Sequence, residues 1–215
     1  MVDFQVCRFR FTDCSDGDMA ITAEDVEQRR TTVVSLPWTW LDQVHGNAVV
    51  TVGSPGEFAG TKADASVTSV KGAAVAIQIA DCAPIALLAP GAVGVVHAGW
   101  RGLASGIVGN AVEALRKLSD GPISAVLGPC IHSKCYEFSY QDLQPLVEKF
   151  GQEVRCNSND GALTFDLPAA VKIALARSGV ETIDDVNICT ACSSQHWSHR
   201  KRGDRQRQAL VAWLE

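Results

Sequence analysis

The sequence predicts one domain of the mixed α/β (α+β) class over residues 1–215. Short apolar runs separated by turn residues indicate buried strands, and segments with helical spacing or helix-start signals lie before and after them. Helices and strands do not alternate strictly and Gly-x-Gly-x-x-Gly is absent, which favours a packed α/β or α+β domain over a Rossmann fold. Apolar residues make up 47% of the chain, enough for a full core.

The strands are expected where apolar residues alternate or run together. Alternation at 5–11 predicts the first strand. A run at 47–52 follows a turn at His45-Gly46-Asn47. Further short runs typical of a buried sheet or sandwich lie at 65–69, 72–80, 84–90, 92–99, 123–129 and 186–190. The last apolar segment, 208–214, fits a strand or a short helix.

Helices are expected from start signals and spacing. Thr22-Ala23-Glu24-Asp25 resembles a capping box and predicts a short helix to about Thr31. The spacing predicts longer helices over 103–118 and 140–150, the second with Pro145 near its first turn or at a kink. Asp166-Leu167-Pro168 predicts the start of a helix that ends at Gly179.

Composition excludes some classes of function. A net charge of −5 argues against a nucleic-acid binder that depends on phosphate neutralisation. No apolar run is long enough to span a membrane, and the first residues lack the pattern of a secretory signal. We therefore expect a cytoplasmic protein whose eight cysteines are thiols or ligands rather than disulfides.

Three chemically active side chains stand where hydrophobic runs end: His45, Cys82 and His97. Two imidazoles and a thiolate suit a catalytic zinc site, which uses three protein ligands and leaves a fourth position open. Without metal, Cys82 could be a nucleophile and His97 its base. Asp81 would be costly to bury unpaired, so it indicates a polar cleft. It is our candidate for orienting a ligand histidine or carrying a proton.

The residues after His97 favour an anion site. A glycine-rich turn leads into a helix start, where backbone N–H groups attract anions. Arg101 could bind phosphate or carboxylate, and Trp100 could stack on a planar ring or simply fill the core. The basic run 198–207, which includes Arg200, fits either an anion cradle or a solvated face.

Cys189 and Cys192 form a Cys-x-x-Cys pair. A structural zinc site needs a second pair. Cys130 and Cys135 could supply it, but their spacing after Gly128-Pro129 is typical of a loop. We therefore expect unmetallated thiols here, with no structural disulfide and no second zinc.

Taken together, these segments resemble one family, the laccase-domain proteins, long labelled multicopper polyphenol oxidases. The resemblance runs from about Trp40 to Leu214. Its motifs, in the family's order, are Gln43-Val44-His45-Gly46, Ala63-Asp64-Ala65, Ala80-Asp81-Cys82-Ala83-Pro84, His97-Ala98-Gly99-Trp100-Arg101-Gly102, Gly128-Pro129 with Cys135-Tyr136-Glu137, Asp166-Leu167 and Cys189-Thr190.

The resemblance implies a layered α/β/β/α sandwich shared with deamidating bacterial toxins that use a cysteine and a histidine. It implies zinc on His45, Cys82 and His97. It also implies phosphorolysis of adenosine, inosine and methylthioadenosine, together with deamination of adenosine. Purine nucleosides and phosphate would then be the partners.

This sequence departs from the family at two places. The segment Phe11-Thr12-Asp13-Cys14-Ser15 is shortened and lacks an arginine usual in the family, and His199 replaces the tyrosine of a Ser-Tyr-Arg-Arg block. These differences bear on substrate preference.

The oxidase label conflicts with the histidine content, because a multicopper enzyme needs more histidines than the five present. Copper in the single site remains compatible with its ligands. The rival readings are a metal-free Cys82/His97 hydrolase acting on cell-wall precursors, a copper-binding polyphenol oxidase and a metal-binding module without activity.

Overall fold

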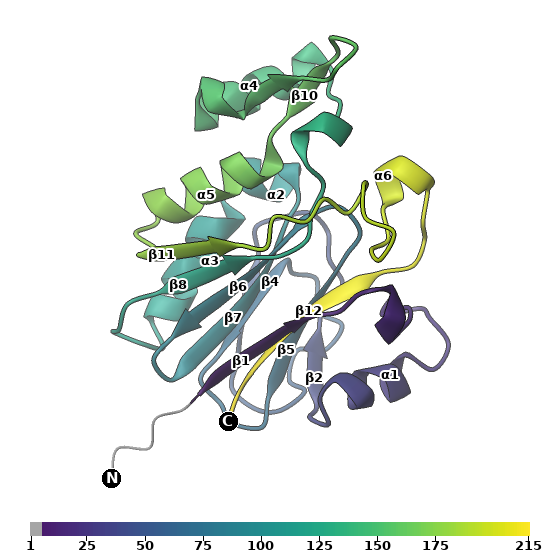
Figure 1. The fold of residues 1–215 in the computed structure, drawn as a ribbon. Helices are drawn as coiled ribbons and strands as arrows, with labels where there is room; N and C mark the ends of the chain where they lie inside the picture. Colours follow the sequence, from purple (N-terminus) through teal and green to yellow (C-terminus); the bar gives the residue numbers. More distant parts are fainter. Residues whose placement is uncertain (1–5) are drawn as a thin grey trace.

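The computed structural model describes residues 6–215, and two β-sheets packed face to face form its centre (Figure 1). One sheet has the strand order β1-β12-β5-β2 and the other β11-β8-β6-β7-β4-β3. The first contains β1 (Cys7–Phe11), β2 (Trp38–Trp40), β5 (Ala74–Ile79) and β12 (Gln208–Leu214). The second contains β3 (Val49–Val52), β4 (Ala65–Thr68), β6 (Ala83–Ala89), β7 (Ala92–Ala98), β8 (Ser124–Leu127) and β11 (Thr182–Asp185).

Helices cover the outer faces of both sheets. On the six-stranded sheet lie α2 (Trp100–Ser105), α3 (Ile107–Arg116) and α5 (Leu167–Arg177), and on the four-stranded sheet lies α1 (Val26–Val33). A separate segment carries α4 (Tyr140–Phe150) and a hairpin of β9 (Arg155–Asn157) and β10 (Leu163–Phe165). The short α6 (His199–Arg202) precedes β12. The predicted layered α/β/β/α architecture is confirmed; the likeness to bacterial toxins stays a prediction.

The core explains why the central strands are apolar on both faces. Every residue of β7 is buried, because one face of the strand packs on α3 and the other on β5 and β12. Strands covered on both sides appear in a sequence as continuous hydrophobic runs. The apolar runs therefore predict these central strands.

Several element boundaries differ from those expected. Gly106, with φ of 92°, divides the expected helix 103–118 into α2 and α3. The first helix begins at Val26 without a side-chain cap, so Thr22 does not cap it. The expected strand 186–190 is wrong apart from one bridge at Cys189, because the strand is the half-exposed β11 just before it. Residues 208–214 are a strand, and Gln5 of the expected first strand lies outside the described residues.

Candidate metal centre and cleft

The fold brings His45, Cys82 and His97 together. Cys82 immediately precedes β6 and His97 lies near the end of β7, and these strands pair so that Pro84 faces His97. His45 comes from the loop that follows β2. Their ligand atoms lie within 4.8 Å of one another. The Cys82 Sγ and His45 Nε2 atoms are 3.8 Å apart, and the two imidazole rings meet edge to face at 4.8 Å between centroids.

One buried carboxylate, that of Asp64, positions both histidines. Its Oδ1 atom lies 2.8 Å from His97 Nδ1 and accepts a hydrogen bond from the His45 backbone N–H at 2.9 Å. Its Oδ2 atom accepts from the Gly46 N–H at 2.7 Å. This arrangement leaves His97 Nε2 as the ring atom available to a ligand, as is usual for metal-binding histidines held by a carboxylate. Burial raises the pKa of Asp64, but the bonds from His97 and these backbone groups leave it lowered overall.

Sequence reasoning gave Asp64 no role of its own, although it stands in a quoted motif. The available signal was an aspartate at the start of a buried strand, which needs partners there. Asp64 is fully buried and spends its carboxylate on the two histidine segments. The sequence predicts the histidine-orienting contact at Asp81. The structure places this contact at Asp64 instead.

The glycine at 99 is required by the close approach of two of the three side chains. A Cβ atom at this position would lie 3.0 Å from His45 Cδ2 and 3.1 Å from Cys82 Sγ. Such contacts are tighter than ordinary van der Waals separation, so any larger residue would displace His45 or Cys82. His45 itself has φ of 58°, a left-handed conformation that the Asp64 contacts hold in place.

The donor set fits a zinc ion. Zinc prefers histidine nitrogen and cysteine sulfur in tetrahedral sites with bonds of about 2.0–2.3 Å, which puts a nitrogen and a sulfur ligand about 3.6 Å apart. The 3.8 Å between His45 Nε2 and Cys82 Sγ is close to that value. Copper also accepts two imidazoles and a thiolate, so the geometry shows a metal-type site without fixing the metal.

Cys82 and His97 also favour each other's charged states. Burial opposes ionisation of both, but the neighbouring imidazolium lowers the pKa of Cys82 to about 6. Burial likewise works against the charged imidazole, yet the thiolate and Asp64 raise the pKa of His97 to about 9. The thiol is therefore ready to act as a thiolate, the form that binds metal or attacks as a nucleophile.

The three residues lie in a cleft of about 470 Å³. The other predicted site residues, Asp81, Trp100, Arg101 and Arg200, also line it. His199 and Arg207, from the basic run 198–207, line it too. Sequence reasoning gave no site role to four further lining residues with polar or aromatic side chains, which are Asp42, Gln43, Gln78 and Tyr136. A cleft of this volume is in the range that holds small-molecule ligands.

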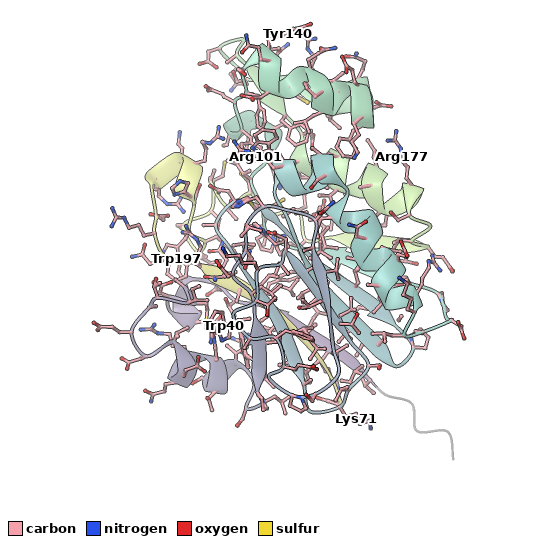
Figure 2. All side chains as sticks on the ribbon, turned by 180° about the vertical axis from the view of Figure 1, so that it is seen from behind. Trp40, Lys71, Arg101, Tyr140, Arg177 and Trp197 are labelled. Carbon is pink, nitrogen blue, oxygen red and sulfur yellow. The ribbon has the colours of Figure 1, made fainter. Side chains whose placement is uncertain are left out.

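The Arg101 guanidinium lies over the Trp100 ring at 4.2 Å, and Trp100 in turn contacts Phe138 edge to face. Trp100 is half-buried, so it both packs on the core and faces the cleft. Arg101 is exposed and has no carboxylate partner among residues 6–215. Figure 2 shows Arg101 on the side of the helical layer that faces α6, and Arg177 on the opposite side.

Asp81 bonds to neither ligand histidine, so the first of its two expected roles belongs to Asp64. Its Oδ1 accepts a hydrogen bond from the Thr190 hydroxyl at 2.6 Å, and its Oδ2 accepts from the Arg200 backbone N–H at 2.7 Å. The Arg200 guanidinium donates to the Glu137 carbonyl and lies 4.8 Å from the Tyr136 ring centroid. Asp81 therefore joins α6 and the Thr190 loop to the cleft, and its role as a proton carrier stays a prediction.

The fold and the cleft define a layered α/β/β/α protein with a His-Cys-His metal-type site. A family model described as multi-copper polyphenol oxidoreductase laccase matches residues 12–215, and the chain belongs to this family. This confirms the resemblance drawn from the sequence motifs.

Two curated relatives are named purine nucleoside phosphorylase. One, from Xylella fastidiosa (strain 9a5c), is 35% identical over 96% of this chain and 85% of its own length. The other, from Streptomyces coelicolor, is 34% identical over 82% of this chain and 74% of its own. Each match covers most of this chain and most of the relative.

Solved structures share the fold. The protein YfiH of Bacillus licheniformis superposes with a TM-score of 0.86 at 23% identity, over 97% of this chain and 93% of that one. The protein NMB0706 of Neisseria meningitidis gives 0.80 at 29% identity, over 92% and 86%. These likenesses support the architecture described above.

The histidines do not assemble a multicopper centre. All five lie among residues 6–215, yet His45 and His97 are the only two that share a candidate metal cluster there. His196 bonds to Ser193, and His199 lines the cleft from α6. A multicopper oxidase centre therefore has no support in the geometry of the described residues. Within the same residues, no helix has the length and apolar character needed to cross a bilayer.

Proposed function

We propose that this chain is a zinc-dependent purine nucleoside phosphorylase that acts on adenosine, inosine and methylthioadenosine and also deaminates adenosine. The observation that carries the proposal is the meeting of a His-Cys-His metal-type cluster with three arginines in one cleft. The names of the two curated relatives support the phosphorylase part of this proposal.

Arg101, Arg200 and Arg207 give the cleft its anion-binding character. Their clustering is notable in a chain with a net charge of −5. Of the two aspartates in the lining, Asp81 already accepts two hydrogen bonds, so it does little to compete for guanidinium groups. Arginine binds phosphate through paired, charge-assisted hydrogen bonds. Arg101 is the best placed because it is exposed and stacked on Trp100.

In phosphorolysis, a phosphate oxygen bonds to C1′ of the ribose while the bond from C1′ to the base nitrogen breaks. The electron pair of that bond leaves with the base, which takes up a proton, and ribose 1-phosphate is released. The arginines hold the phosphate and balance its charge as it approaches the sugar. Trp100 and Tyr136 supply aromatic surface in the cleft for the purine ring.

In deamination, water adds to C6 of adenosine and ammonia leaves. His45, Cys82 and His97 would hold the zinc ion, and Asp64 would fix both imidazoles. A bound zinc ion lowers the pKa of water and polarises carbonyl and phosphoryl oxygens. Asp81, at the cleft wall, is the candidate for moving the proton.

The test is a screen of zinc-loaded protein against the three nucleosides, with and without phosphate. Adenosine and inosine should give free base and ribose 1-phosphate only when phosphate is present. Methylthioadenosine should likewise give adenine and 5-methylthioribose 1-phosphate. Arg101→Ala should raise the KM for phosphate more than the KM for nucleoside, and Arg101→Lys should restore little because an ammonium lacks the planar fork. Arg155→Ala, an exposed arginine outside the cleft, is the matched control and should change neither value.

An unchanged phosphate dependence in Arg101→Ala would remove Arg101 from the site. Release of free ribose without phosphate would contradict phosphorolysis itself. These two results are distinct, because the first concerns one residue and the second the reaction.

A second candidate is a Cys-His hydrolase acting on cell-wall precursors. The observation that favours it is the chain of contacts from Asp64 to His97 and the lowered pKa of Cys82, which together resemble an activated thiol nucleophile. Alkylation of Cys82 separates the two functions. In the phosphorylase, bound zinc protects Cys82 from iodoacetamide, and removal of the zinc abolishes activity. A thiol hydrolase works without metal.

A further inference from the structure

A second sulfur cluster lies outside the cleft. Cys135, Cys189 and Cys192 place their sulfur atoms within 4.8 Å of one another, and the Cys135 and Cys192 Sγ atoms are 3.4 Å apart. All eight cysteines lie in the described part of the chain, and each is a free thiol there. The Cys-x-x-Cys pair identified in the sequence has therefore gained a third partner from a distant loop.

We propose that Cys135, Cys189 and Cys192 form a second metal site that binds a thiophilic cation with a filled d shell, such as Zn²⁺. This revises the expectation of unmetallated thiols, which set Cys130 and Cys135 aside because their spacing is typical of a loop. Zinc bonds to thiolate sulfur at about 2.3 Å, so two sulfurs of a tetrahedral site lie about 3.8 Å apart. Three sulfurs within 4.8 Å need only small adjustments to reach that geometry.

The backbone holds the three sulfurs in place. A parallel bridge joins Cys130 to Cys189, with the Cys130 N–H donating to the Ile188 carbonyl and the Thr190 N–H donating to the Cys130 carbonyl. A tight turn then brings Cys192 back over Cys189, whose carbonyl accepts from the Cys192 N–H at 3.1 Å. Cys135 ends a short 3-10 helix, Ser133–Cys135, that begins just after this bridge. The site is thus positioned by main-chain contacts rather than by chance approach of mobile side chains.

The surroundings of Cys189 suit a thiolate ligand. The His132 backbone N–H points at Cys189 Sγ with a separation of 3.4 Å, a contact that stabilises charge on sulfur. Cys189 is buried, Cys135 is partly buried and Cys192 is exposed. A cation can therefore enter from the Cys192 side, where water can complete its coordination. Cys130, which the sequence offered as a ligand, is not part of the cluster.

Metal here would tie two walls of the cleft together. Tyr136, next to Cys135, lines the cleft, and Thr190, next to Cys189, bonds to Asp81. A ligand that binds only the folded chain stabilises it by mass action. Metal bound here would therefore raise the stability of the folded chain on this side of the cleft.

The test is the zinc content of the full chain, reduced, loaded with zinc and freed of excess metal. Wild type should hold about two zinc ions per chain, and both Cys192→Ser and His97→Ala should hold about one. Cys156→Ser, at a cysteine outside both clusters, is the control and should keep two. With Co²⁺ as the probe, Cys192→Ser should lose more of the sulfur-to-metal absorption than His97→Ala. The reason is that the site at Cys192 has three thiolate ligands, whereas the site at His97 has one.

Equal zinc content in wild type and Cys192→Ser would overturn the proposal, as would a single wild-type zinc that His97→Ala removes. A disulfide between Cys135 and Cys192 would show as a mass lower by two hydrogens and as one linked peptide. If these cysteines then took up no zinc after reduction, that result would also overturn the proposal. If Cys192→Ser fails to fold, Cys135→Ser supplies the same comparison. None of these results depends on nucleoside turnover, so the proposed activity is tested separately.

Discussion

The two sulfur-containing clusters of this molecule contrast in their ligands and in their supports. His45, Cys82 and His97 mix nitrogen with sulfur, open onto a cleft and are held by the buried Asp64. The cluster of Cys135, Cys189 and Cys192 is all sulfur and rests on backbone turns outside that cleft. Mixed three-ligand sites with an open side are typical of catalytic zinc, and thiolate-rich sites of structural zinc. The two clusters therefore differ in their support: a buried carboxylate holds the first, and main-chain contacts hold the second.

The largest expected effect is loss of the cleft metal. Cys82→Ala, His45→Ala and His97→Ala each remove one of three ligands, so each should lose the cleft zinc and nucleoside turnover while staying folded. Metal analysis and circular dichroism check this. Full retention of the cleft metal in Cys82→Ala would sink the assignment of these ligands.

A smaller loss should follow from Asp64→Asn. The amide keeps the size of the side chain but cannot accept as the carboxylate does from His97 and the His45 loop. Removing such a supporting group typically lowers metal affinity about 10–100-fold. Asp81→Asn is the matched control, because Asp81 bonds to Thr190 and Arg200 rather than to a histidine. A zinc titration that finds Asp81→Asn the weaker binder would reverse the roles assigned to the two aspartates.

The smallest of these effects is expected for Gly99→Ala. The new methyl group would press on His45 and Cys82 at about 3 Å, so zinc affinity should fall on the order of tenfold, the low end for residues that position ligands. Gly109→Ala in α3 is the control, because its Cβ meets nothing closer than 3.7 Å. That variant should keep its affinity and gain up to about 1 kcal/mol of stability from helix propensity. Identical affinities in both variants would show that the approach at Gly99 is not constraining.

The sequence predicts the first cluster well because each of its residues ends an apolar run. Strand ends that pair in a sheet must lie together, as Cys82 and His97 do through β6 and β7. The partners of these residues were harder to foresee. Asp64 and Asp81 are both aspartates beside buried strands, and only the three-dimensional register decides which of them meets an imidazole.

The sequence named Cys135, Cys189 and Cys192 among possible ligands, but nothing in it shows that the loops carrying them meet. Cys135 and Cys192 are separated by 57 positions, and no apolar pattern marks the bridge between Cys130 and Cys189 that aligns them. The half-exposed strand β11 was missed for another reason. A strand at a sheet edge is only partly buried, so its sequence is largely polar. The central strands, buried on both faces, were predicted because burial requires apolar residues.

The central claim is that the cleft performs metal-dependent phosphorolysis. Its most direct test follows ribose 1-phosphate formation from inosine by metal-free protein as zinc is added back, with and without phosphate. The account predicts no product before zinc is added, and product afterwards only when phosphate is present. Full activity in the metal-free protein, or release of free ribose without phosphate, would contradict it.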